Sequence, residues 1–138
     1  MTWLVERLAE LCRHVEHLRG LRGRVDGAGA LRRDLSLHND VLFSLLSVCQ
    51  NVIDISGELS ARRGLTFEDY TQAIRNLATL DGFSDELIDE LSLLPGFRNV
   101  LIHEYVALDL DRAVDALHRL EPVEAFVEIV RRIESDES

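Results

Sequence analysis

The chain has 138 residues, of which 25 are acidic and 15 are arginine, and with no lysine its formal net charge is −10. An apolar fraction of 46% is enough for one domain with a buried core, and it excludes a disordered chain. The acidity excludes a protein that coats nucleic acid, because contact with many phosphates requires a basic surface. No apolar run is long enough for a membrane span and only two cysteines are present, so we expect a cytoplasmic protein without membrane attachment.

The charge is unevenly distributed along the chain. Residues 1–33 hold seven arginines and four acidic residues, a net charge of +3, whereas the remaining residues carry −13. A polyanionic partner would therefore be bound at a small local site.

The hydrophobic pattern predicts a single all-α domain over residues 1–138, built as a four- to five-helix bundle. In chain order the expected helices cover 3–18, 31–59, 66–80 with Thr66 as its N-cap, 84–105 with a break at Pro95-Gly96, and 109–134 with a kink at Glu121-Pro122. Residues 135–138 are expected to form a frayed tail.

The long second helix carries more apolar surface than one core-facing side requires. One apolar stripe contains Val41, Leu45, Val48, Val52, Ile55 and Leu59, and a neighbouring stripe contains Leu42, Leu46, Cys49 and Ile53. Such a helix is either central in its bundle or shared between the core and a partner chain.

A polar stripe runs along the same helix. It contains Asp40, Ser44, Ser47, Asn51, Asp54 and Glu58. Such a stripe is either a solvated face or the polar wall of a cleft, and the small uncharged residues at 44, 47 and 51 favour the cleft wall. Asp54 is a candidate partner for an arginine at such a site.

Several catalytic arrangements are disfavoured. His14 and His17 would supply only half of a metal site, and no further Cys/His cluster completes it. Cys49 lies in an apolar stripe, which is typical of a core residue and not of a nucleophile. We therefore expect neither a metal ion nor another cofactor.

A polar cluster follows Pro95-Gly96 within an otherwise apolar segment. On a helix Asn99 and His103 face the same way, while Arg98 and Tyr105, seven residues apart, share a neighbouring face. The aliphatic residues between them would pack inward. An arginine beside a histidine indicates a site in which the arginine stabilises negative charge and the histidine transfers a proton.

At these residues the chain resembles the HEPN superfamily, and within it the HepT toxins of HepT/MntA-type toxin–antitoxin pairs. The family signature Arg-x4-His-x-Tyr, usually beginning Arg-Asn, is matched by Arg98-Asn99 to His103-Glu104-Tyr105 without a gap. The resemblance covers residues 31–134, and the first helix (residues 1–20) is a looser match. Further segments that fall in the family's order are Asn51-Val52-Ile53-Asp54, the helix of Tyr70, Asp81-Gly82-Phe83 and Leu94-Pro95-Gly96-Phe97.

The resemblance implies a homodimeric, metal-independent ribonuclease whose two motifs meet in a cleft. In that scheme His103 is the general acid or base, Arg98 binds the scissile phosphate, and Asn99 orients the phosphate or His103. Tyr105 matches the tyrosine that a minimal nucleotidyltransferase antitoxin (MntA-like) adenylylates, which would exclude RNA from the cleft. Asn51 and Asp54 would support the site from the long helix.

Two other functions are compatible with the same residues. The chain would be a non-catalytic helical module that presents RNA or a nucleotide to a partner nucleotidyltransferase, with Arg98 and His103 only binding phosphate. Alternatively it would be a structural dimerisation bundle, which predicts a buried, hydrogen-bonded His103 with no cleft beside it.

Overall fold

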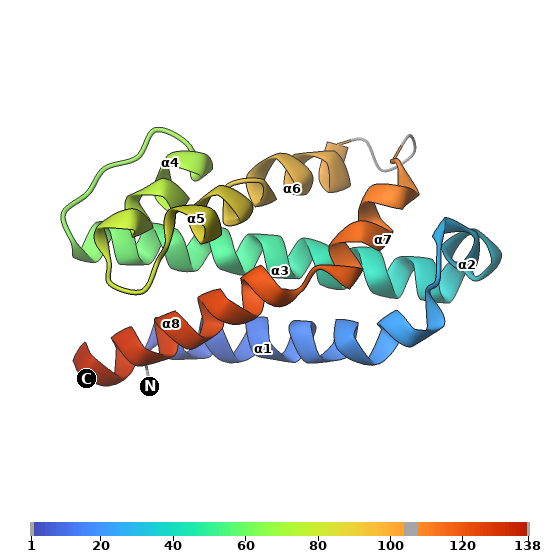
Figure 1. Ribbon diagram of the computed structural model, residues 1–138, viewed down its shortest axis with the longest axis horizontal. Helices are drawn as coiled ribbons and strands as arrows, with labels where there is room; N and C mark the ends of the chain where they lie inside the picture. Colours follow the sequence, from blue (N-terminus) through green and yellow to red (C-terminus); the bar gives the residue numbers. More distant parts are fainter. Residues whose placement is uncertain (1, 104–107, 138) are drawn as a thin grey trace.

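The computed structural model describes residues 2–103 and 108–137, and all regular structure within them is helical, which confirms the predicted all-α fold (Figure 1). The elements in chain order are α1 (Trp3–Leu21), the 3-10 helix η1 (Arg22–Arg24), α2 (Ala28–Arg33), α3 (Leu35–Arg62), α4 (Tyr70–Arg75), the 3-10 helix η2 (Asn76–Thr79), α5 (Asp85–Leu91), α6 (Leu94–His103), α7 (Leu110–His118) and α8 (Glu121–Glu137). No helix within the described ranges is long and apolar enough to cross a membrane.

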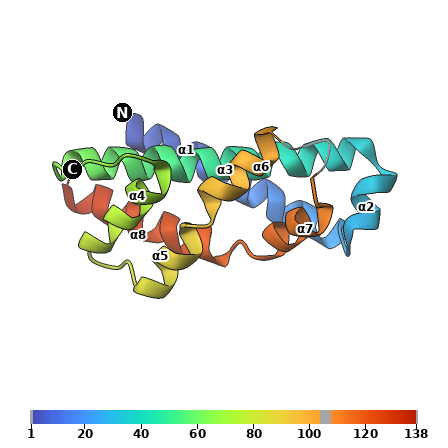
Figure 2. The ribbon, with the colours of Figure 1, turned by 90° about the horizontal axis from the view of Figure 1, so that it is seen from above.

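Helix α3 is the central element of the bundle. Helices α1, α2, α4, α6 and α7 all pack against it, and α8 lies along α1 and α5 (Figures 1 and 2). The first apolar stripe predicted on this helix is buried along its whole length, as are Cys49 and Ile53 of the second stripe. The structure therefore gives this helix a central position, while Leu42 and Leu46 of the second stripe are half-buried.

Two predicted helix boundaries were wrong because an aspartate caps a helix at another place. The segment expected as one helix from residue 31 is divided at Asp34, whose carboxylate accepts a hydrogen bond from the backbone N–H of Leu37 at 3.1 Å and starts α3. Helix α4 begins at Tyr70 and not at Thr66, because Asp69 caps it by accepting a hydrogen bond from the backbone N–H of Gln72 at 2.8 Å.

The two prolines lie in the first turns of helices, where a missing N–H costs no hydrogen bond. Pro95 belongs to the first turn of α6 and Pro122 to that of α8. The expected kink at Glu121-Pro122 is a complete break, since α7 ends at His118 and α8 begins at Glu121.

The C-terminal segment is helical through Glu137, so the frayed tail predicted from residue 135 was wrong. The carboxylate of Glu137 forms ion pairs with Arg62 at 3.7 Å and with Arg63 at 2.9 Å, and Glu134 forms a further pair with Arg62 at 3.3 Å. These contacts attach the last turn of α8 to the end of α3, which explains why the helix continues.

Candidate functional site

The motif residues lie on α6, which is attached to the bundle by one face only. Phe97 and Leu101 are buried, each with 7% of its surface exposed. Arg98 is half-buried, and Asn99 and His103 are exposed on the side of the helix that points away from the core. The helix therefore presents its polar side chains to the surface from a fixed apolar base.

Arg98 is held by three neighbours. Its Nε donates a hydrogen bond to Oε1 of Gln50 at 2.7 Å, and its Nη1 donates one to Oδ1 of Asn99 at 3.1 Å. The ring of Tyr70 lies 5.6 Å from the guanidinium carbon, which is within the range of a cation–π contact. Helices α3, α4 and α6 each contribute one of these neighbours.

Asp54 does not pair directly with Arg98, so this part of the predicted site was wrong. Within the described residues its carboxylate accepts a hydrogen bond from Nε2 of Gln50 at 2.8 Å, and Gln50 contacts Arg98 on its other side. Gln50 and Tyr70 were not predicted as site residues. The sequence signal for Gln50 is its place one helical turn before Asp54, on the same face of α3.

The prediction of a cleft wall along α3 was also wrong, because α1 packs against that side. Asn51 is 4% exposed and its side-chain amide donates to the backbone oxygen of Ser47 at 2.9 Å, so it does not reach the motif. Ser44 is 2% exposed and lies 3.1 Å from Nδ1 of His14 on α1. The polar stripe therefore contacts two different helices. Ser44 lies against α1, whereas Asp54 is linked to Arg98 of α6 through its hydrogen bond with Gln50.

His103 is exposed, and it is the last residue of α6 that the structure describes. The interpretation of the chain as a purely structural bundle required this histidine to be buried, and the structure contradicts that. Tyr105, the predicted adenylylation site, lies outside the described residues.

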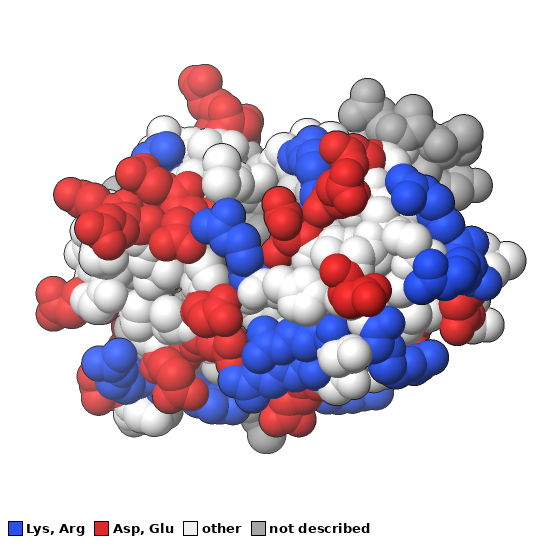
Figure 3. All heavy atoms as spheres, turned by 45° about the vertical axis from the view of Figure 1, so that its right-hand side comes forward, with Lys and Arg blue, Asp and Glu red and all other residues white. Residues whose placement is uncertain are grey.

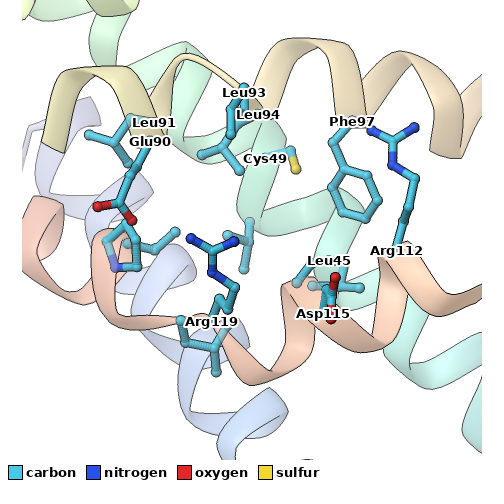
Figure 4. Close-up of a pocket in the computed structure, with 15 residues that line it drawn as sticks. Leu45, Cys49, Glu90, Leu91, Leu93, Leu94, Phe97, Arg112, Asp115 and Arg119 are labelled. Carbon is cyan, nitrogen blue, oxygen red and sulfur yellow. The ribbon is translucent and has the colours of Figure 1, made fainter. Parts of the chain in front are cut away.

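Arg98, Asn99 and His103, the motif residues that the structure describes, do not line the pocket drawn in Figure 4. This pocket has a volume of about 240 Å³ and opens between α6 and α7, with Phe97, Cys49 and Leu45 among its apolar lining. Arg112 and Arg119 reach over it from the α7 side (Figure 4). Arg98, Asn99 and His103 therefore lie on a different side of α6 from this pocket.

The residues expected to have no catalytic role are engaged in the fold. Cys49 is 1% exposed, and burial raises the pKa of its thiol to about 12, although the nearby charge of Arg98 opposes the shift. His14 lies 3.1 Å from Glu10 and His17 lies 2.7 Å from Asp40, so the two histidines take separate partners. The prediction that Cys49 is a core residue is confirmed.

Basic side chains gather in space in spite of the overall acidity. On the face shown in Figure 3, arginines form a nearly continuous band along the lower edge, while acidic side chains lie mainly above it. Arg24 of η1 and Arg32 and Arg33 of α2 are all exposed. The positive segment recognised in the sequence thus supplies exposed cations at one end of the bundle.

The all-helical fold and the Arg98-x4-His103 motif at the surface agree with a HEPN-type domain. The model of the family described as ribonuclease HepT-like matches residues 8–130. The mRNA nuclease HepT of Shewanella oneidensis is 25% identical over 130 residues, which cover 93% of this chain and 96% of that protein.

Solved structures of toxins show the same fold. The tri-AMPylated HEPN toxin of Shewanella oneidensis, in complex with an MNT antitoxin, has a TM-score of 0.81 and 25% identity, over 96% of this chain and 99% of that one. A toxin–antitoxin structure with AMP-PNP has a TM-score of 0.81 and 24% identity, over 94% and 97% of the two chains. This chain belongs to the ribonuclease HepT-like family.

Proposed function

We propose that this ribonuclease is the toxin of a toxin–antitoxin pair and cleaves RNA with Arg98 and His103, without a metal cofactor. The observation that carries the proposal is that α6 presents both side chains at the surface from a buried apolar base. The HepT relative is named as an mRNA nuclease, which supports RNA as the substrate class.

The chemistry follows from the two side chain types. The imidazole of His103 accepts the proton of a ribose 2′-hydroxyl as its oxygen attacks the adjacent phosphorus. The bond from phosphorus to the 5′-oxygen breaks, and a protonated imidazole returns a proton to that leaving oxygen. The products are a 2′,3′-cyclic phosphate and a 5′-hydroxyl, so the step needs no external oxidant or metal.

Arg98 supplies the positive charge that this step requires. The pentacoordinate phosphorane carries more negative charge than the bound phosphodiester, and a preorganised guanidinium stabilises it selectively. Asn99 accepts a hydrogen bond from Arg98 and shares the exposed side of α6 with His103, so it is a positioning residue between the two.

A second copy of the chain completes the site in this proposal. We assign Phe43 and Leu46 of α3 and Ile102 of α6 to an apolar patch that a second copy would cover; Phe43 is 63% exposed and Ile102 is 38% exposed. Because α6 runs antiparallel to α3 and Arg98 lies opposite Gln50, Ile102 is level with Leu46 (Figure 1). Burial of this patch between two copies would place two motifs next to each other, with one His103 as base and the partner's His103 as acid.

Control of the toxin is proposed to act at Tyr105, two residues beyond His103. A nucleotidyltransferase antitoxin would transfer AMP from ATP to the phenol oxygen and release pyrophosphate. The added nucleotide would bring bulk and negative charge to the motif, which would repel the RNA backbone. The AMPylated state of the solved HEPN toxin supports this assignment.

Substitution of either motif residue should stop cleavage without unfolding the protein. We expect His103→Ala to lower the rate about 10²- to 10⁴-fold, because a positioned acid or base contributes that much. Arg98→Ala should also abolish growth arrest on expression. The measurement is cleavage of RNA by purified protein in EDTA, with circular dichroism as the control for folding. A folded His103→Ala variant that cleaves normally would instead favour the non-catalytic binding module.

A charge within the apolar patch should separate the dimer. Phe43→Glu is expected to give monomers in light scattering and to reduce cleavage more than about tenfold, since a carboxylate is costly in an apolar interface. Leu93→Glu, at a residue that is 69% exposed and outside the patch, is the matched control and should leave both properties unchanged. A wild-type protein that is monomeric and fully active would contradict the dimeric site.

Modification should be confined to the motif tyrosine. Incubation with the antitoxin and ATP is expected to add adenylate units to the intact mass, and peptide fragmentation should locate them at Tyr105. The matched control is Tyr70→Phe, which keeps Tyr105 and should be modified like wild type. An unmodified Tyr105 in a protein that the antitoxin nevertheless inhibits would refute this mode of control.

A further inference from the structure

We propose that Gln50, oriented by Asp54, is a positioning residue that holds Arg98 in place while leaving its charge free for a phosphate. The inference rests on the proposed function and adds to it the group that prepares the arginine. Gln50 lies on α3 and touches Arg98 across the packed α3–α6 contact, 48 residues apart in the chain.

The orientation of the Gln50 amide is determined from both sides. Towards Arg98 it must present its oxygen, because Nε of the guanidinium is a donor; the two atoms are 2.7 Å apart. Towards Asp54 it must present its nitrogen, because a carboxylate only accepts; that contact is 2.8 Å. A reversed amide would oppose donor to donor and acceptor to acceptor. Asp54 therefore holds Arg98 indirectly, by fixing the amide between them.

A neutral contact has a different electrostatic effect from an ion pair. A carboxylate in place of Gln50 would hold Arg98 equally well but would compensate its charge and occupy its fork of donors. Within residues 2–103 and 108–137 the contacts of Arg98 are to neutral groups: the amides of Gln50 and Asn99 and the ring of Tyr70. The arginines that form ion pairs within these ranges are Arg13, Arg19, Arg24, Arg62, Arg63, Arg75 and Arg131.

Among the described residues, these contacts also leave Nη2 of the guanidinium without an acceptor. Nε donates to Gln50 and Nη1 donates to Asn99, while the ring of Tyr70, on α4, makes the cation–π contact. Nη2 can then meet a phosphate oxygen without first breaking a contact to a carboxylate. Holding the side chain in advance removes part of the rotamer entropy that binding would otherwise cost.

The test exchanges the positions of the charge and the amide. In Gln50→Glu with Asp54→Asn, net charge and side-chain shape are conserved, but the carboxylate moves against Arg98. We expect the variant to fold, and to lose at least about tenfold in kcat/KM for a synthetic single-stranded RNA, mainly through a higher KM. Its kcat/KM should also depend less steeply on salt than that of wild type, because one cation is compensated.

Gln50→Leu tests the hydrogen bond itself, and Gln72→Leu is its matched control. Gln72 makes the same type of contact one turn along its helix, to Oδ1 of Asn76 at 2.9 Å, but it is exposed and does not touch Arg98. Gln50→Leu should lose about tenfold or more in kcat/KM. Gln72→Leu should cleave like wild type.

A spectroscopic measurement separates this role from catalysis. The Nε–H resonance of Arg98 can be assigned by its loss in Arg98→Lys. Its proton should exchange slowly with water in wild type and in the double variant Gln50→Glu/Asp54→Asn, and rapidly in Gln50→Leu. Slow exchange in Gln50→Leu, or normal kcat/KM in the double variant, would overturn the proposal. If wild type cleaves no RNA although the resonance behaves as expected, the ribonuclease mechanism fails and the positioning role stands.

Discussion

The contact between α6 and α3 is the interaction on which the site depends. Phe97 and Leu101 are buried against the central helix, and full burial of such side chains contributes on the order of 1.5–3 kcal/mol each. Because one face of α6 is attached in this way, the rotation of the helix is fixed and Arg98 is directed to its partners on α3 and α4. His103, five residues further along α6, is left at the surface. Apolar packing thus sets the position of polar groups that contribute little to stability themselves.

The acidity of the chain limits how RNA can be bound. Because the chain has ten more carboxylates than cations, it would have to bind RNA through a few arginines at defined positions. Most of the ion-paired arginines connect helices or successive helix turns. Arg98 is distinguished by its neutral partners, Gln50 and Asn99. In the proposed dimer, two copies of the motif would double that charge.

The sequence predicted the helices well and the site in part. Helical periodicity and capping residues located α1, α5 and the core stripe of α3, and the motif located Arg98 and His103 on one helix. The caps at Asp34 and Asp69 were missed because several nearby polar residues have similar capping propensity. Gln50 was missed because its role arises from a contact between α3 and α6, and spacing along one helix does not reveal which side another helix covers. For the same reason Asn51, on the polar stripe, was assigned to a cleft although α1 covers that side.

The central claim is that the side chains of α6 cleave RNA by activating the ribose 2′-hydroxyl. The most direct measurement uses a synthetic RNA containing one mapped cleavage site and the same RNA with a single 2′-deoxy nucleotide at that site, each incubated with purified wild-type protein in EDTA. The account predicts that the all-ribose strand is cut to a 2′,3′-cyclic phosphate and a 5′-hydroxyl, and that the substituted strand stays intact at that position. Cleavage of both strands at equal rates would contradict it.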